Sequence, residues 1–203
     1  MKRLLLFIAL STVFAITIQA QNSAKAKAIL NKTANIIGHK GGASANFSIS
    51  SPKIGSASGS IAIKGNKYHA RTSQATVWFN GKTQWTYMKR TNEVNVTNPS
   101  QAQQQMMNPY TFINIYKSGY KLEMKTSGNN YIVHLTAANK NRSIQEMYIT
   151  VNKSSYIPST VKMKQGSTWT TIRIRNFKAK NQPDGIFLFK SKDFPTAEVV
   201  DLR

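Results

Sequence analysis

The chain has 203 residues, with 28 Lys and Arg against seven Asp and Glu, three His and no Cys. The lack of Cys excludes disulfides, thiolate metal sites and thiol nucleophiles. The formal charge of +21 favours an anionic partner. We expect residues 1–20 to be an export signal and residues 21–203 to form a single domain.

The first residues have the pattern of a cleavable signal peptide. Lys2 and Arg3 precede an apolar run, and Ala20 supplies the small residue of a cleavage site. A membrane anchor is the alternative, although the run from residue 4 to 18 is short for a spanning helix of about 20 apolar residues. Export disfavours nucleic acid as the anionic partner. Anionic lipid head groups, anionic glycans or an acidic protein surface are left as partners. The alternative is that the positive charges only form a solvated outer face.

A helix is expected directly after the signal peptide. Ser23 is a suitable cap for a helix that runs to about Ile37, where Gly38 follows. Apolar residues recur on one side of it at helical spacing, namely Ala26, Ile29, Leu30, Ala34 and Ile37. This helix either covers the apolar face of a sheet or plugs an open barrel.

Short alternating segments separated by turn residues follow along the rest of the chain. They predict an antiparallel sandwich or barrel and argue against a parallel sheet. Asn80-Gly81 between two of them predicts a hairpin with a type I′ turn. The predicted strands are 43–50, 57–64, 67–73, 75–79, 83–89, 92–97, 119–126, 130–136, 143–152, 158–164, 168–178 and 185–190.

Residues 99–117 interrupt this pattern. Pro99 and a Gln-rich stretch precede Met106 and Met107, and Phe112, Ile113 and Tyr116 follow at helical spacing. We expect short helices inserted in the sheet. The methionines suit a surface that adapts to apolar ligands, and ordinary core packing explains them equally.

Residue patterns typical of catalysis and of metal binding are missing from the sequence. His39, His69 and His134 lie far apart, whereas a zinc site favours closer spacing. Glu93 and Glu123 are conceivable as a carboxylate pair, but solvated or salt-bridged acids explain them better. No phosphate-binding glycine loop, nucleophile elbow or dinucleotide fingerprint occurs. We therefore expect no enzyme activity, no metal and no cofactor.

Several segments, taken in order, resemble those of the LolA family of periplasmic outer-membrane lipoprotein carriers. They follow the signal peptide and the opening helix. The segments are Gly59-Ser60-Ile61-Ala62-Ile63-Lys64, then Tyr68, the hairpin Asn80-Gly81-Lys82-Thr83-Gln84-Trp85-Thr86-Tyr87, Asn108-Pro109 with Phe112, Phe187-Leu188-Phe189 through Phe194-Pro195, and Val199-Val200-Asp201.

This resemblance implies a mainly β (α+β) fold: an unclosed, strongly curved antiparallel half-barrel with an N-terminal helix and a central helical insert over its concave face. It implies a monomeric periplasmic carrier that binds the acyl chains of lipoproteins. The implied partners are an inner-membrane ABC complex that releases lipoproteins, and an outer-membrane receptor or the outer membrane itself. Family members often carry Arg after the lysine that corresponds to Lys64, and it helps to hold the lid. Here Gly65 follows, so that latch is not carried over.

The candidate lipid-binding positions are apolar residues on the predicted strands, all of which we place on the concave face, and apolar residues of the covering insert. These positions are Ile61, Ile63, Val77, Phe79, Trp85, Tyr87, Val94, Val96, Met106, Met107, Phe112 and Ile113.

The alternative to a lipoprotein carrier is an exported module that binds a lipid or glycolipid and has no shuttle role.

Overall fold

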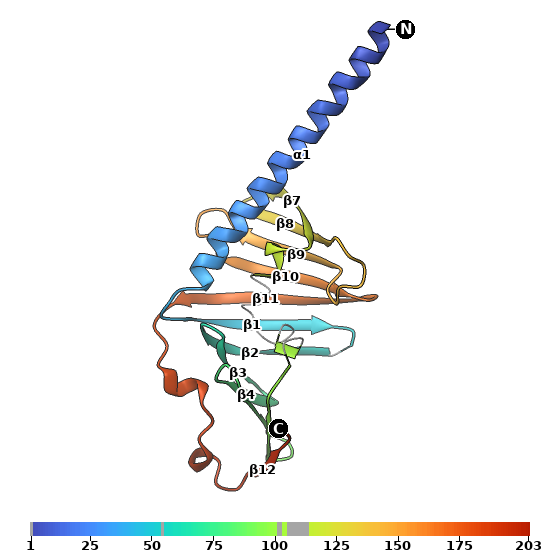
Figure 1. Ribbon diagram of the computed structural model, residues 1–203. Coiled ribbons are helices and arrows are strands. Elements are labelled where there is room, and N and C mark those ends of the chain that lie inside the picture. Colours follow the sequence, from blue (N-terminus) through green and yellow to red (C-terminus); the bar gives the residue numbers. More distant parts are fainter. Residues whose placement is uncertain (1, 54, 101–102, 105–113) are drawn as a thin grey trace.

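The computed structural model describes residues 2–53, 55–100, 103–104 and 114–203, with the backbone alone for residues 2–19. A long helix, α1 (Lys2–Ile37), leads into one large curved sheet that contains all twelve described strands (Figure 1). The mainly β fold, with an unclosed antiparallel sheet and an N-terminal helix, is therefore confirmed.

The strands form two hairpin-connected runs that meet at the centre of the sheet. Their order across the sheet is β12-β6-β5-β4-β3-β2-β1-β11-β10-β9-β8-β7. All neighbours are antiparallel except β12, which lies parallel to β6, and the two edge strands β12 and β7 do not pair. The strands are β1 (Ala43–Ser51), β2 (Gly55–Lys64), β3 (Lys67–Thr72), β4 (Ala75–Phe79), β5 (Gln84–Met88), β6 (Glu93–Thr97), β7 (Tyr120–Ser127), β8 (Asn130–Ala137), β9 (Glu146–Asn152), β10 (Pro158–Gln165), β11 (Thr168–Ala179) and β12 (Glu198–Asp201).

The strand register assigns each side chain to one face of the sheet, because directly opposed residues of antiparallel strands point to the same side. The helix face is the side that carries Ile63, Ile172 and Val133, and α1 packs against it. The tail face is the side that carries His69 and Trp78, and it is crossed by residues 180–197.

Helix α1 begins well before Ser23, so the predicted helix start is wrong. Residues 2–37 contain neither Gly nor Pro, and nothing in that stretch interrupts the helical hydrogen bonds. Gly38 follows the last turn, and its N–H donates to the Ala34 carbonyl at 2.7 Å. The N-terminal part of α1 projects beyond the sheet (Figure 1). Among the described residues, no helix has the length and apolar character needed to cross a membrane.

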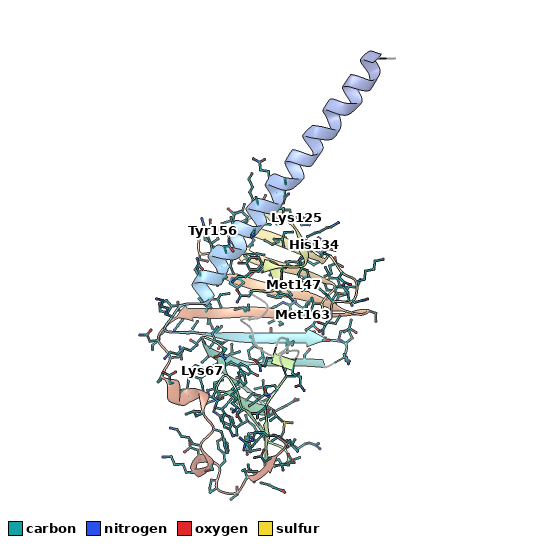
Figure 2. The ribbon with its side chains drawn as sticks, in the orientation of Figure 1. Lys67, Lys125, His134, Met147, Tyr156 and Met163 are labelled. Carbon is teal, nitrogen blue, oxygen red and sulfur yellow. The ribbon has the colours of Figure 1, made fainter. Side chains whose placement is uncertain are left out.

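Two apolar clusters lie on the helix face. The first joins Ala26, Ile29 and Leu30 of α1 to strands β7–β10 and includes the cross-strand neighbours Met147 and Met163 (Figure 2). The second lies at the end of α1 and comprises Ile37, Ala43, Ile63, Tyr68 and Phe79. Each Val, Leu, Ile, Phe or Met side chain in these clusters contributes roughly 1.5–3 kcal/mol when fully buried, so the clusters fix α1 against the sheet.

The C-terminal segment differs from the sequence prediction. Residues 185–190 were expected to form a strand, but Asp184–Phe187 form the 3₁₀-helix η2 and Ser191–Asp193 form the 3₁₀-helix η3. The Asp184 carboxylate accepts hydrogen bonds at 2.9 Å from both Lys64 and Lys67, and Lys67 lies beside this segment in Figure 2. These two ion pairs hold the segment against the sheet.

The Asn80-Gly81 hairpin is confirmed, but its predicted turn type is wrong. A type I′ turn needs positive φ at both central residues, whereas of these two only Gly81 has positive φ, at 100°. Phe79 pairs with Gln84, so the connection has four residues. The Asn80 Oδ1 accepts hydrogen bonds from the backbone N–H groups of Lys82 and Thr83 at 2.9 and 2.8 Å. A side-chain turn of this kind replaces the tighter two-residue loop.

The helical insert predicted within residues 99–117 lies largely outside the described residues. Its described end is the 3₁₀-helix η1 (Ile115–Lys117). Tyr116 is buried there, and its hydroxyl donates to the Asn31 Oδ1 of α1 at 2.6 Å. This end of the segment is thus tied to α1.

Candidate functional site

An apolar hollow of about 260 Å³ lies between the end of α1 and the helix face of the sheet. It occupies the space between the two apolar clusters. Small side chains, such as Ala43, Ala45 and Ala70, face it from strands β1 and β3, and larger ones surround them. The other lining residues are Thr33, Ile37, Ser44, Phe47, Ile49, Ile61, Ile63, Ile149, Pro158, Val161, Ile172, Ile174 and Phe177.

Strand alternation produces this lining. On β1, Phe47 and Ile49 share the helix face with Ile174 and Ile172 of β11, directly opposite them. Polar residues occupy the alternate positions, as in an antiparallel sheet that buries one side. Among the described residues that line it, none has an ionisable side chain, so the lining favours a hydrocarbon ligand.

Thr33 is an exception to this apolar lining. The residue is 3% exposed, and its Oγ1 has no hydrogen-bond partner among the described residues. A buried hydroxyl without a partner costs about 1–3 kcal/mol. The hollow therefore contains one polar atom that an ester or amide carbonyl of a ligand could satisfy.

A buried polar pair lies in the second apolar cluster. The Tyr68 hydroxyl donates to Gln84 Oε1 at 2.6 Å, and the Tyr68 and Phe79 rings lie 5.1 Å apart. Burial raises the pKa of Tyr68 to about 12, so the phenol stays neutral. Neither group adds charge to this end of the molecule.

The predicted lipid-binding positions do not share one face. Ile61 and Ile63 line the hollow, and Val77 and Phe79 lie on the same face in the neighbouring cluster. The other four strand positions lie on the tail face, since Trp85 pairs with Trp78 and not with Phe79 or Val77. These four are Trp85, Tyr87, Val94 and Val96. The expectation that all eight strand positions face one concave surface is wrong. Met106, Met107, Phe112 and Ile113 lie outside the described residues.

Sequence reasoning missed most of the lining from β1 and β11. Phe47 and Ile49 alternate with Ser48 and Ser50, and Ile172 and Ile174 alternate with arginines. That alternation indicates an apolar face. Only the pairing of β1 with β11, which are far apart in the chain, shows that the two faces adjoin.

Aromatic side chains on the tail face of β4 and β5 pack against the C-terminal segment. Trp78 contacts the rings of Phe189 and Phe194 edge-on, with centroids 5.5 Å apart in both pairs. Tyr87 lies 4.7 Å from Phe194. These aromatic residues of β4 and β5 thus dock the segment that leads to β12.

The acids and histidines considered as catalytic candidates are dispersed. Glu93 is on β6 and Glu123 on β7, near opposite edges of the sheet, so they form no carboxylate pair. His134 lies 2.9 Å from Glu146 and stacks on Tyr148, on the tail face. Within the described ranges, no three His, Asp or Glu side chains gather in a metal-binding arrangement.

The profile of a protein family, outer membrane lipoprotein carrier protein LolA, matches residues 16–167. The chain belongs to this family. The match includes most of α1 and the strands from β1 to β10, and therefore much of the lining of the hollow. A comparison with curated proteins finds no match.

Solved structures share this fold at low sequence identity. An uncharacterised conserved protein from Thermus thermophilus is 12% identical, with a TM-score of 0.58 over 87% of this chain and 99% of that one. MucB is 9% identical, with a TM-score of 0.50 over 83% of this chain and 64% of that one. A LolA superfamily protein from Nitrosomonas europaea is 14% identical, with a TM-score of 0.45 over 81% and 97%.

Proposed function

We propose that this protein is an exported carrier that binds the acyl chains of lipoproteins and takes them from the inner to the outer membrane. The observation that carries the proposal is the uncharged apolar hollow between α1 and the sheet, in a chain of the LolA family. Each methylene transferred from water into such a site contributes about 0.8 kcal/mol. A lipid-modified protein needs such shelter to cross an aqueous compartment, and no covalent chemistry is required.

The size of the hollow limits the length of acyl chain that can enter it. About 260 Å³ is slightly below the roughly 300–1,000 Å³ of typical ligand pockets. A hollow of this size accommodates part of one acyl chain without rearrangement. Thr33 and Ile37, near the end of α1, form part of the wall. In this proposal, displacement of that end of α1 from the sheet admits further chain length.

The carrier proposal includes the partners and compartment that the family resemblance implies. Residues 1–20 direct export and are removed, and residues 21–203 act as one domain in the periplasm. The cargo comes from an inner-membrane ABC complex and goes to an outer-membrane receptor or the membrane itself. Cleavage after Ala20 would remove the projecting part of α1 and retain Ala26, Ile29 and Leu30, which hold the helix on the sheet.

The decisive experiment is a release assay. Inner-membrane vesicles that contain the ABC complex, ATP and a labelled lipoprotein are incubated with the purified protein. We expect the lipoprotein to leave the membrane in a soluble one-to-one complex. Retention on the membrane, where an established carrier releases it, would contradict the carrier role. The alternative, a lipid- or glycolipid-binding module without a shuttle role, would then be tested by mass spectrometry of the co-purified ligand.

A matched pair of variants ties release to the hollow. Ala45→Phe fills the hollow from β1, whereas Ala138→Phe adds the same group at an exposed position that lines neither this hollow nor the second cavity described below. We expect Ala45→Phe to lower lipoprotein release at least tenfold and Ala138→Phe to leave it unchanged. Equal release by both variants would show that the hollow is not the acyl site.

A further inference from the structure

A second and larger cavity lies on the tail face, on the opposite side of the sheet from the apolar hollow. This tail-face cleft has a volume of about 1,090 Å³ and lies between strands β11, β1, β2 and β3 and the C-terminal segment. Its floor consists of small side chains of β1 and β2, among them Ser44, Asn46, Ser60 and Ala62. The cleft thus has a mixed polar and apolar lining, whereas the lining of the hollow is apolar.

The strand register explains the shape of the cleft. Lys178 of β11, Ser44 of β1, Ala62 of β2 and His69 of β3 form one cross-strand row. Three strand spacings separate the first from the last, or roughly 14 Å. The two middle positions carry small side chains, and long side chains stand at both ends. The C-terminal segment supplies the remaining wall through residues such as Leu188 and Lys190.

Positive charge predominates around the cleft. Arg71, Lys178 and Lys190 line it together with a single carboxylate, Asp193, which gives three positive charges against one negative, a net charge of +2. In the described part of the chain, none of the three cations has a carboxylate partner. By contrast, Lys64 and Lys67 nearby share the single carboxylate of Asp184, which offsets one of their two positive charges. Three unpaired cations from three separate segments therefore surround one cavity.

His69 adds a neutral donor to this wall. The Arg71 Nε–H donates to His69 Nε2 at 3.1 Å, so the histidine proton lies on Nδ1. Stacking on Trp78, with ring centroids 5.4 Å apart, holds the imidazole plane. The Arg71–His69–Trp78 series fixes the position of Arg71 on the side of the cleft that faces Lys178.

We propose that the tail-face cleft is a binding site for a phosphate-bearing ligand, distinct from the apolar hollow. A phosphate monoester carries about −1.5 to −2 charges near neutral pH, which matches the net charge of the cleft. Arg and Lys are the side chains that bind phosphate oxygens best. The hydroxyl and amide groups of Ser44, Ser60 and Asn46 are positioned to bind the polar remainder of the ligand. A soluble phosphorylated compound and a phospholipid head group share this chemistry.

The test compares two double variants that remove the same charge. Lys178→Gln/Lys190→Gln neutralises two sides of the cleft. Lys125→Gln/Lys140→Gln removes two exposed lysines that do not line it. Neither Lys178 nor Lys190 has a carboxylate partner among the described residues, so both variants should fold, as circular dichroism and thermal melting will show. Binding is measured by calorimetry at fixed ionic strength with inorganic phosphate and glycerol 3-phosphate, and by co-sedimentation with phosphatidylglycerol or phosphatidylcholine vesicles.

We expect the wild-type protein to bind a phosphate probe, the Lys178/Lys190 variant to bind it at least tenfold more weakly, and the Lys125/Lys140 variant to bind it as the wild type does. This pattern with soluble probes identifies a soluble phosphorylated ligand. The same pattern with phosphatidylglycerol vesicles alone identifies a lipid head group. If both variants bound the probe equally weakly, the loss of affinity would follow from overall charge alone, and the proposal would be overturned. Failure of the wild-type protein to bind any probe would also overturn it. Neither double variant alters a residue that lines the hollow, so acyl-chain binding there does not change the comparison between them.

Discussion

Thr33 places an unsatisfied hydroxyl in the wall of the apolar hollow. Val has nearly the same shape and needs no hydrogen bond, so Thr33→Val removes a desolvation penalty of about 1–3 kcal/mol. We expect the variant to be about 1 kcal/mol more stable than the wild type in urea unfolding of the ligand-free protein.

Thr83→Val is the matched control for this prediction. Thr83 is buried to a similar degree, at 6% exposed, but its Oγ1 donates to Asn98 Oδ1 at 3.0 Å. The same substitution should therefore destabilise the protein by about 1 kcal/mol. Opposite signs for the two variants would confirm that the Thr33 hydroxyl has no partner. A loss of stability in both would contradict it.

His69 should make stability depend on pH in a defined window. Burial, and secondarily the positive charge of Arg71, lowers the pKa of His69 from 6.5 to about 4. The unfolded chain therefore binds a proton below pH 6.5 that the folded protein takes up only near pH 4. Stability is lost as the pH falls through this window, by up to about 3 kcal/mol.

The contribution of His69 to this pH dependence is measured by urea unfolding of His69→Gln and of the control His39→Gln. The two measurements are made at about pH 7 and about pH 4.5, which lie on either side of the unperturbed histidine pKa. His39 is exposed. The His69 variant should lose less stability between the two pH values than the wild type does, and the His39 variant should match the wild type. A wild-type pH dependence retained in His69→Gln would assign the effect to other groups.

At the scale of elements, α1 protects one open edge of the sheet. The Asn22 side chain makes two hydrogen bonds to the backbone of Met124 in β7: its Nδ2 donates to the Met124 carbonyl at 3.1 Å, and its Oδ1 accepts from the Met124 N–H at 2.7 Å. The free N–H and carbonyl groups of an edge strand would otherwise be open to pairing with another chain. Asn22 therefore takes the place of a short strand at this edge.

Replacing Asn22 with Ala should open that edge. We expect a loss of about 1–3 kcal/mol and faster hydrogen exchange at the Met124 amide, because two hydrogen bonds disappear together. Asn35→Ala is the control, since Asn35 is exposed on the same helix. Unchanged exchange at Met124 would show that the contact does not persist in solution.

Element prediction worked where the pattern is local. Ten of the predicted strands overlap closely with observed ones in the region from residue 43 to 179, and the 143–152 segment differs by starting later, at Glu146. The faces to which β5 and β6 point their side chains were not predictable. Alternation within a strand shows which side chains share a face, but it does not show which face that is, because the register with the neighbouring strand is unknown. The observed register pairs Trp85 with Trp78, one position away from Phe79, and so Trp85 lies on the other face from Phe79. The start of α1 was predicted wrongly for a related reason. Ser23 is a suitable N-cap residue, but residues 2–22 are equally compatible with a helix and continue it towards the N-terminus.

The whole molecule uses the two faces of one sheet for two environments. The helix face holds an uncharged apolar hollow, and the tail face holds a polar cleft with net positive charge. The curved sheet and its helix were predictable from the sequence through alternation and through the family resemblance. The cleft was not, because Arg71, Lys178 and Lys190 meet only when β3, β11 and the C-terminal segment are brought together.

The pairing of β1 with β11 has a consequence for how the chain folds. Residues 43–97 and 120–179 each form hairpins between strands that are close in sequence, but Ala43 must find Ala179 before the two halves join. Contacts of such long sequence separation form slowly. In pulsed hydrogen exchange during refolding, the amides shared by β1 and β11 should gain protection after those of β7 and β8. A chain that is synthesised from its N-terminus therefore exposes the open edge of β1 until β11 has been made. A chaperone that covers this edge would shorten the period in which two molecules can pair wrongly.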